Sequence, residues 1–415
     1  MTVSTDVIVV GAGAIGLSCA YYLNQQGHAV TVVDKGRVGS GCSHGNAGLI
    51  VPSHVVPLAA PGVVSQGLKW LFKATSPFYI KPRLSPTLGA WLWRFLRACT
   101  EERMRAAIPV MHGLLQTSLD LFEELEAAGI QGAGPERKGM FMVYEGDKGY
   151  KDCMRTAELA REQGLVVDEL GEQTLRDMEP CLPKATAGGI FFQQDAHLDP
   201  AAMVSGMRDY LANRGVVFKE NTKVTGFDRQ GSKLTRVHTD QGPIEGAHVV
   251  LAGGAWSSKL LGGIKLPVQA GKGYSITVDT KGGGPKLPMI LAEAKVSVTP
   301  LGNQVRFGGT LELSGIDPRI NRKRASGLLQ AATEMVPGFD SDSIATEDIW
   351  AGYRPCTPDG LPIIGSYPGL DNLTVATGHA MVGISLAPVT DKLVGALVDG
   401  HKPCLDVGPL SVTRF

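Results

Sequence analysis

The chain begins with a short apolar run, a stretch of helical periodicity and a second apolar run. Residues 6–10 (DVIVV) are apolar and mostly β-branched, which predicts a buried strand. Between residues 15 and 23 apolar positions recur at helical spacing, and Gly27 ends the predicted helix. Residues 29–34 (AVTVVD) predict a second buried strand. This order predicts a βαβ unit, and therefore a parallel sheet with a right-handed crossover.

A different pattern occupies the middle of the chain. Residues 139–144 and 188–194 are short apolar runs that predict strands of another sheet. Residues 272–278 and 296–313 alternate apolar and polar positions around a turn near Gly302, which predicts antiparallel hairpin strands. The middle of the chain therefore predicts an antiparallel domain.

The strand, glycine and helix pattern returns at residues 248–254 and 373–398. We therefore expect an α/β fold with an α+β insert, in which a Rossmann-type domain with a parallel sheet is discontinuous in sequence and an antiparallel-sheet domain interrupts it.

Three further helices are predicted from local signals. One spans residues 111–128 and carries an apolar stripe. Another follows Asp199, an N-cap residue type. The third begins near Gly383 or Ile384, because Pro388 is tolerated only within the first turn of a helix.

A glycine fingerprint lies in the first turn of the βαβ unit. Residues 9–16 (VVGAGAIG) match G-x-G-x-x-G. Gly11 permits the tight turn, Gly13 lets the backbone approach a pyrophosphate, and Gly16 lets helix and strand pack closely. Asp34 follows at the end of the second strand, where a carboxylate accepts a hydrogen bond from a ribose hydroxyl and disfavours NADP.

The residues after Asp34 favour FAD over NAD. Residues 35–50 (KGRVGSGCSHGNAGLI) form a glycine-rich polar loop that can lie along an extended cofactor, although a flexible surface loop is the alternative. No second G-x-G-x-x-G occurs, which disfavours a reductase that takes electrons from NADPH.

Composition excludes several classes of partner. The formal net charge is zero, which disfavours nucleic acid as a ligand. The seven cysteines form no C-x-x-C pair and are odd in number, which favours reduced thiols, an intracellular compartment and no metal site. We expect neither a cleavable signal peptide nor a membrane-spanning helix, because the first residues lack a basic region and no apolar run approaches about 20 residues.

Six motifs together resemble a known family. They are VVGAGAIG (9–16), SHGNAG (43–48), LAGGAWS (251–257), KGYS (272–275), GYRPCTPDGLPIIG (352–365) and TGHAMVGIS (377–385). In this order they resemble the D-amino acid dehydrogenase branch of the FAD-dependent amino acid and amine oxidoreductases, which include D-amino acid oxidase, glycine oxidase and sarcosine oxidase. The resemblance implies an FAD-binding domain at 1–75, 145–270 and 355–415, and a substrate-binding domain at 76–144 and 271–354.

The resemblance also implies a set of cofactor contacts. The implied contacts are Gly11, Gly13, Ala14, Ile15, Gly16, Asp34, Lys35, Ser43, His44, Asn46, Ala47, Gly48, Val224, Ala252, Gly253, Gly378, His379, Gly383 and Ile384. Sarcosine oxidases attach FAD through a cysteine near the arginine motif, where this chain has Gly352, so we expect noncovalent FAD. Cys356 is the nearest thiol.

Arg354 is the implied anchor of the substrate carboxylate. Its guanidinium forks toward two oxygens as lysine cannot. Tyr274 and Tyr353 are candidate second contacts, with ordinary aromatic packing as the alternative. His379 is a further candidate, with a core histidine as the alternative. No convincing general base emerges from the sequence.

The implied activity is oxidative deamination of D-amino acids to 2-oxo acids and ammonia, with hydride transfer from Cα to flavin N5 and electrons passed to a quinone-type or artificial acceptor. An oxidase that uses oxygen, a dehydrogenase for glycine, sarcosine, proline or hydroxyproline, and a noncatalytic flavin-binding subunit are the alternatives.

We expect a cytoplasmic protein whose partners are a small amino acid and an electron acceptor, with peripheral contact to the inner membrane left open. Residues 67–97 bear on that contact, either as an interfacial patch or as helices packed over the active site. Their aromatic and basic side chains include Lys69, Trp70, Phe72, Lys73, Trp91, Trp93, Arg94, Phe95 and Arg97.

Overall fold

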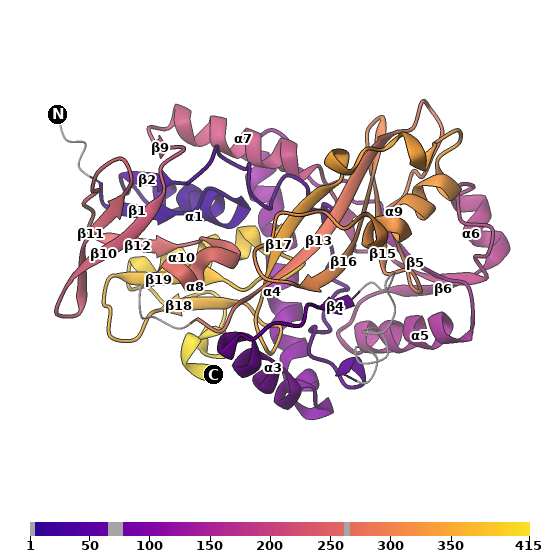
Figure 1. Ribbon diagram of the computed structural model, residues 1–415, viewed down its shortest axis with the longest axis horizontal. Helices are drawn as coiled ribbons and strands as arrows, with labels where there is room; N and C mark the ends of the chain where they lie inside the picture. Colours follow the sequence, from indigo (N-terminus) through magenta and orange to yellow (C-terminus); the bar gives the residue numbers. More distant parts are fainter. Residues whose placement is uncertain (1–4, 65–77, 261–265) are drawn as a thin grey trace.

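The computed structural model describes residues 5–64, 78–260 and 266–415. Its described part contains a six-stranded sheet, at the left of Figure 1, in the order β18-β19-β12-β1-β2-β9. The strands are β1 (Val7–Val10), β2 (Val30–Val33), β9 (Val217–Lys219), β12 (His248–Leu251), β18 (Ile363–Ser366) and β19 (Leu373–Thr377). All neighbours are parallel except β18, which pairs antiparallel with β19. The parallel βαβ unit predicted from the first 34 residues is confirmed.

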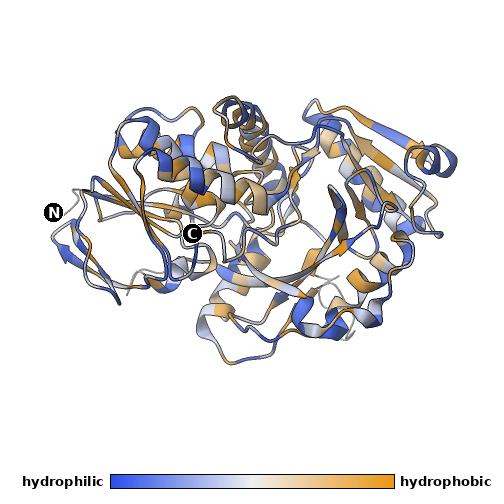
Figure 2. Ribbon diagram, turned by 90° about the horizontal axis from the view of Figure 1, so that it is seen from above, coloured by the Kyte–Doolittle hydropathy of each residue, from blue (hydrophilic) through white to orange (hydrophobic). Residues whose placement is uncertain are grey.

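Helices cover one face of this sheet and a hairpin lies at the other. Val7 and Val9 belong to the core shared with the helices, whereas Ile8 and Val10 pack in the core shared with the hairpin. This alternation follows from the two-residue period of a strand. The helices are α1 (Ala14–Gln25), α4 (Glu101–Ala127), α7 (Pro200–Asn213) and α10 (Ala387–Val398), and the hairpin is β10 (Val224–Gln230) and β11 (Lys233–Thr239). Figure 2 shows hydrophobic residues concentrated on the sheet strands.

The second sheet, at the right of Figure 1, is mostly antiparallel. Its described strands run in the order β17-β13-β16-β15-β14-β5-β7-β6. A further strand, β4, pairs parallel with the C-terminal end of β16. Their bounds are β4 (Phe78–Ile80), β5 (Met140–Tyr144), β6 (Val167–Gly171), β7 (Gly188–Phe192), β13 (Gln269–Asp279), β14 (Met289–Leu291), β15 (Val296–Leu301), β16 (Gln304–Leu313) and β17 (Trp350–Cys356). The predicted hairpin around Gly302 is confirmed, because β15 and β16 pair antiparallel. Gly302, in the turn between them, has a φ of 62°.

Shorter elements and the remaining helices connect or cover the sheets. The helices are α3 (Pro86–Ala98), α5 (Asp147–Glu162), α6 (Glu172–Met178), α8 (Ser257–Leu260) and α9 (Arg322–Met335), and the 3-10 turns are η1 (Gly254–Trp256), η2 (Ser341–Ser343), η3 (Thr346–Asp348), η4 (Gly408–Leu410) and η5 (Val412–Arg414). A two-stranded ladder joins β3 (Leu49–Ile50) to β8 (Ala196–His197).

The structure corrects two helix boundaries. α4 begins at Glu101 rather than at residue 111, because Thr100 caps it and the helix continues through Pro109. α10 begins at Ala387 rather than near Gly383 or Ile384, which leaves Pro388 in the first turn, where its missing N–H has no partner to lose. By contrast, α7 begins at Pro200 after an Asp199 cap, as predicted.

Two strands belong to a different sheet from the one that their predicted domain implies. β6 and β7 fall in the range 145–270 expected for the FAD-binding domain, yet their hydrogen bonds lead through β7 to β5 in the second sheet. The domain boundaries as a whole stay a prediction. Within the described ranges no helix is long and apolar enough to cross a membrane, and no group of three metal-binding side chains occurs.

Candidate functional site

One cavity of about 2040 Å³ is lined by elements of both sheets. Its wall includes Gly11 and Gly13 from the glycine fingerprint and Thr310 and Arg354 from β16 and β17. The glycine turn and the arginine predicted to serve cofactor and substrate therefore line the same space.

The glycine fingerprint forms a turn that other residues could not adopt. Gly11 has a φ of 113°, and a Cβ atom there would lie 2.5 Å from the carbonyl oxygen of Ala252. At Gly16 a Cβ atom would lie 1.8 Å from the carbonyl oxygen of Gly11. The first glycine thus makes the turn and the third lets α1 pack against β1, as the fingerprint predicts.

Two side chains organise the backbone N–H groups at this end of the cavity. The Asp34 carboxylate accepts hydrogen bonds from the backbone N–H groups of Ala12 (2.8 Å) and Gly36 (2.9 Å). The Ser43 hydroxyl accepts one from the N–H of Ala14 in the first turn of α1 (2.9 Å). A glycine turn at a helix N-terminus with an ordered carboxylate beside it fits the pyrophosphate and ribose of a dinucleotide.

Most of the predicted cofactor contacts line the cavity. These are Gly11, Gly13, Ala14, Ile15, Asp34, Lys35, Ser43, Asn46, Ala47, Val224, Ala252, Gly253, His379, Gly383 and Ile384. Gly16, His44, Gly48 and Gly378 lie outside the lining and support it instead. His44 bonds through Nδ1 to the Gly39 carbonyl (2.9 Å), and a Cβ atom at Gly48 would lie 2.1 Å from the carbonyl oxygen of Leu198.

The Trp350 ring connects the cofactor loop to the second sheet. A Cβ atom at Gly45 or at Gly352 would lie 2.2 Å or 2.1 Å from this ring. The ring also meets the imidazole of His44 edge-on, with 5.4 Å between centroids. Gly352, the position compared above with the flavin-linked cysteine of sarcosine oxidases, therefore makes room for an indole.

Arg354 reaches from β17 across β13 to the backbone of β16. Its Nη1 donates to the carbonyl oxygen of Thr310 (2.5 Å) and its Nη2 to that of Gly309 (3.4 Å). A Cβ atom at Gly273, on the intervening strand, would lie 1.9 Å from Nη1. Burial lowers the pKa of Arg354 from its usual value, and a guanidinium stays charged nonetheless.

A β-bulge supplies the carbonyl groups that hold this guanidinium. The pairing of β13 with β16 shifts register between Lys272 and Tyr274, and Thr310 has a φ of 61°. Such bulges re-aim backbone groups next to functional sites. Within the described chain Arg354 forms no ion pair, so its remaining donors are available to an anionic ligand.

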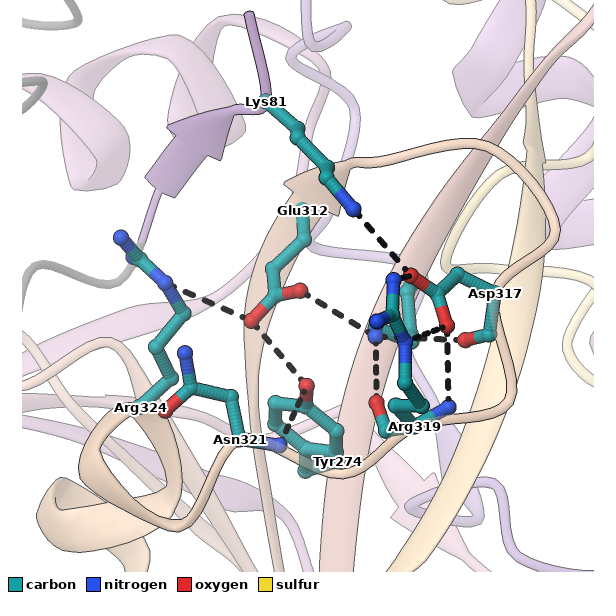
Figure 3. A network of polar contacts seen from close by, with 8 residues as sticks. Lys81, Tyr274, Glu312, Asp317, Arg319, Asn321 and Arg324 are labelled. Atoms are coloured by element: carbon teal, nitrogen blue, oxygen red, sulfur yellow. Dashed lines mark hydrogen bonds and ion pairs between the residues drawn. The ribbon is translucent and has the colours of Figure 1, made fainter.

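Tyr274 lines the cavity, but its hydroxyl has other partners. The hydroxyl donates to Glu312 Oε1 (3.1 Å) and accepts from the backbone N–H of Asn321 (3.2 Å). Glu312 also meets Lys272 (3.4 Å) and Arg324 (3.5 Å), and all four side chains are buried (Figure 3). This network ties β13, β16 and α9 together, so the geometry does not support a substrate contact for the Tyr274 hydroxyl.

Tyr353 and His379 both line the cavity, and the side chain of each has a partner within the protein. Tyr353 and Arg354 are consecutive on β17 and point to opposite faces, and the Tyr353 ring packs edge-on against Trp256. The His379 imidazole bonds through Nε2 to Thr390 Oγ1 on α10 (2.9 Å), and burial lowers its pKa to about 3. This matches the core-histidine alternative, while residues 379–384 still line the cavity.

Sequence reasoning missed Ser53, His54 and Asp195. Ser53 and His54 line the cavity, and the Asp195 carboxylate lies behind them, hydrogen-bonded to Ser53. Residues 52–54 read PSH, which matches no catalytic motif, and Asp195 is 142 positions from Ser53. Only the folded chain brings these side chains together.

The aromatic segment divides between the cavity and the surface. Trp91 is buried, lines the cavity and donates through Nε1 to the carbonyl of Cys356 (3.0 Å). Phe95 stacks on it, with 5.1 Å between ring centroids. Trp93 is 62% exposed, and Leu96, which also borders the cavity, is 48% exposed. One face of α3 therefore packs over the cavity, as one of the two predicted alternatives has it. Lys69, Trp70, Phe72 and Lys73 lie outside the described residues.

Known proteins match this chain over its whole length. A D-amino acid dehydrogenase of Bradyrhizobium diazoefficiens is 33% identical, covering 99% of this chain and 98% of that protein, and one of Neisseria meningitidis serogroup C is 30% identical with 99% of both covered. Glycine oxidase from Geobacillus kaustophilus superimposes with a TM-score of 0.78 at 26% identity, covering 99% of both chains. L-proline dehydrogenase from P. horikoshii shares the fold, with a TM-score of 0.74 at 19% identity and 100% and 98% covered.

A family model matches residues 6–397, which include both sheets and every side chain placed at the cavity above. With the full-length relatives, this match extends from the glycine fingerprint through Arg354 to α10. The chain therefore belongs to the FAD dependent oxidoreductase family.

Proposed function

We propose that this protein catalyses FAD-dependent oxidative deamination of D-amino acids to 2-oxo acids and ammonia. The observation that carries the proposal is Arg354, held by the carbonyls of β16 in the same cavity as the dinucleotide turn. The D-amino acid dehydrogenases at 30% identity or more support the choice of substrate class.

Each part of the cavity has a role in this reaction. Arg354 would bind the substrate carboxylate with paired charge-assisted hydrogen bonds and so orient Cα. Gly11, Gly13 and Asp34 would hold the pyrophosphate and ribose of FAD. When bound, FAD supplies the acceptor for the hydride that leaves Cα. Water then hydrolyses the imino acid, and the electrons pass to an external acceptor.

Two alternatives follow from the structural neighbours. Glycine oxidase and L-proline dehydrogenase share this fold, so a primary or secondary amine of another class, or oxygen as the acceptor, would use the same cavity. A flavin-binding subunit without turnover is the alternative from another class. Arg354, aimed into the cavity without an acidic partner in the described chain, favours an enzyme over that alternative.

Anaerobic mixing with amino acids tests the proposal. The bound flavin should bleach with D-isomers and stay oxidised with the L-isomers of the same side chains. Glycine, sarcosine and L-proline in the same panel distinguish the alternative amine substrates. Readmitting oxygen, and separately a quinone analogue, identifies the acceptor. A flavin that no amino acid bleaches would overturn the proposal.

The exposed edge of α3 supports peripheral contact with a membrane, where quinones reside. Trp93 is exposed to solvent, and Arg97 lies over its ring. Aromatic and basic side chains together favour the lipid interface. Flotation with vesicles containing anionic lipid should carry the protein upward, and Trp93→Ser should reduce the floated fraction. Equal flotation of both proteins would contradict this contact.

A further inference from the structure

Asp195, Ser53 and His54 form a hydrogen-bonded chain that ends at the cavity. The Asp195 carboxylate accepts from the Ser53 hydroxyl (Oδ2, 2.5 Å) and from the Ser53 backbone N–H (Oδ1, 3.0 Å). His54 Nδ1 lies 3.1 Å from the Ser53 hydroxyl oxygen. Both Ser53 and His54 line the cavity, while Asp195 is 1% exposed.

The hydrogens in this chain can be assigned from its partners. A serine hydroxyl has one hydrogen, and here it is donated to Asp195. The Ser53 oxygen must therefore accept the hydrogen on His54 Nδ1, which leaves Nε2 with a lone pair. No described residue is hydrogen-bonded to Nε2. The chain thus presents an acceptor at the cavity wall and a carboxylate behind it.

Burial prepares this chain to take up one proton. Burial raises the pKa of Asp195 to about 7, opposed by its two hydrogen bonds from Ser53, and burial lowers the pKa of His54 to about 4. A proton that enters at Nε2 therefore has its stable position on Asp195 and not on an imidazolium. A carboxyl group with a pKa near 7 is suited to general acid–base catalysis at neutral pH.

We propose that His54, Ser53 and Asp195 relay the proton that the substrate ammonium group must lose before Cα is oxidised. This inference rests on the proposed function and supplies a general base, which the sequence motifs did not identify. The geometry that carries it is one unbranched path from the cavity wall to a buried carboxylate.

The transfer balances as three concerted proton movements. The substrate N–H proton moves to His54 Nε2, the Nδ1 proton to the Ser53 oxygen, and the Ser53 proton to Asp195 Oδ2. The products are a neutral amine, a neutral imidazole of the other tautomer and a protonated carboxylic acid. No electrons move in this step, and the amine lone pair becomes available when hydride leaves Cα.

Other charged groups near the chain do not share its path. His197 lies two residues from Asp195, and its Nε2 is 3.9 Å from Glu136 Oε2, which also pairs with Lys138 (2.6 Å). Lys295 lines the same cavity and pairs with Asp152 (3.6 Å). Arg354 also lines the cavity and is assigned to the substrate carboxylate.

Variants of each relay member test the inference in the holoenzyme. The rate of anaerobic flavin reduction by a D-amino acid would be followed from pH 6 to 10 in Asp195→Asn, Ser53→Ala and His54→Gln. At neutral pH the rate of flavin reduction in each variant should be lower than in the wild type by a factor of about 10² to 10⁴. The rise of that rate with pH should shift toward the pKa of the free amino group of the substrate. High pH should therefore restore much of the rate.

Two measurements separate a relay from a structural role. His112→Asn removes a half-buried histidine outside the cavity wall and should leave the pH profile unchanged. Infrared difference spectra above pH 7, on binding an amino acid without a Cα hydrogen, should show a new protonated carboxyl band that is absent in Asp195→Asn.

The outcomes distinguish this inference from the proposed function. A wild-type flavin that no amino acid reduces overturns the proposed function. A wild-type flavin that is reduced, with unchanged pH profiles in variants that retain FAD, overturns the relay alone. The absence of the carboxyl band in the wild type also overturns it, and this readout remains available if one variant fails to fold.

Discussion

The guanidinium of Arg354 lies over Gly273, where a Cβ atom would come within 1.9 Å of Nη1. The glycine therefore provides the space through which the arginine crosses β13 to the carbonyls of Thr310 and Gly309. The position of the proposed carboxylate anchor depends on a residue that contributes no side chain.

Gly273→Ala should displace the guanidinium and leave the cofactor end intact. We expect KM for the amino acid to rise, and kcat/KM to fall about 100-fold, because an error of about 1 Å in position costs that much. Steady-state kinetics with an artificial acceptor measures this. Gly226→Ala on β10, where a Cβ atom meets nothing within 4 Å, is the matched control. Equal kinetics in both variants would contradict the prediction.

Arg354→Leu should abolish binding of the carboxylate while FAD remains bound. The expected loss in kcat/KM is about 2–5 kcal/mol, as for truncating one partner of a buried charge pair. Arg354→Lys should recover only part of it, because an ammonium cannot fork toward two oxygens. The flavin absorbance of each purified variant is the control for folding. Unchanged kcat/KM in the leucine variant would refute the assignment.

Glu312→Gln should destabilise the fold more than the loss of an exposed carboxylate does. Lys272 and Arg324 would keep two buried positive charges without their shared partner (Figure 3). Breaking a buried ion pair in this way typically costs about 3–5 kcal/mol, which urea denaturation measures. Glu245→Gln, from an exposed pair with Arg236, should change stability little. Similar midpoints for the two variants would contradict the prediction.

Denaturation should release FAD from the polypeptide. Gly352 offers no thiol, and burial raises the pKa of both Cys42 and Cys356, the latter to about 12, so these thiols stay protonated and weakly nucleophilic. Acid precipitation should leave the flavin in the supernatant. Flavin retained in the pellet would indicate a covalent bond, and Cys42→Ser and Cys356→Ser would then locate it.

D-amino acids with apolar side chains should be the better substrates. One apolar cluster of aliphatic and aromatic side chains contributes to the described lining of the cavity that contains Arg354. Its members in the lining include Phe78, Ile80, Trp91, Phe95, Leu311 and Leu313. The carboxylates in the described lining, Asp34 and Asp240, lie with the cofactor-binding residues. Burying a leucine or phenylalanine side chain is worth about 1.5–3 kcal/mol. A preference for D-lysine or D-glutamate over D-leucine in kcat/KM would contradict this.

Local signals were enough to predict much of the fold. The first βαβ unit, the cap at Asp199 and the hairpin at Gly302 each depend on neighbours in sequence, and each is confirmed. The predicted start of α4 at residue 111 was wrong, because the chain stays helical through Pro109 back to the Thr100 cap.

The candidate site was predictable only as far as its motifs are contiguous. The role of the Tyr274 hydroxyl depends on Glu312, 38 positions away, and no pattern in KGYS indicates that partner. The chain from His54 to Asp195 likewise crosses from the end of the cofactor loop to the segment before β8. Hydrogen-bond partners that meet only in the folded state leave no periodic trace in the sequence.

The Trp350 ring, inserted where Gly45 and Gly352 leave room for it, has a consequence for how the protein recognises its ligands. The indole belongs to the strand that carries Arg354, and it contacts Gly45 in the loop of residues 35–50 that is predicted to border the cofactor. Neither can move toward the other without displacing it. The distance between this loop and the strand that carries Arg354 is thus set by the folded chain before either ligand binds. A substrate must therefore fit the fixed distance between the cofactor and Arg354.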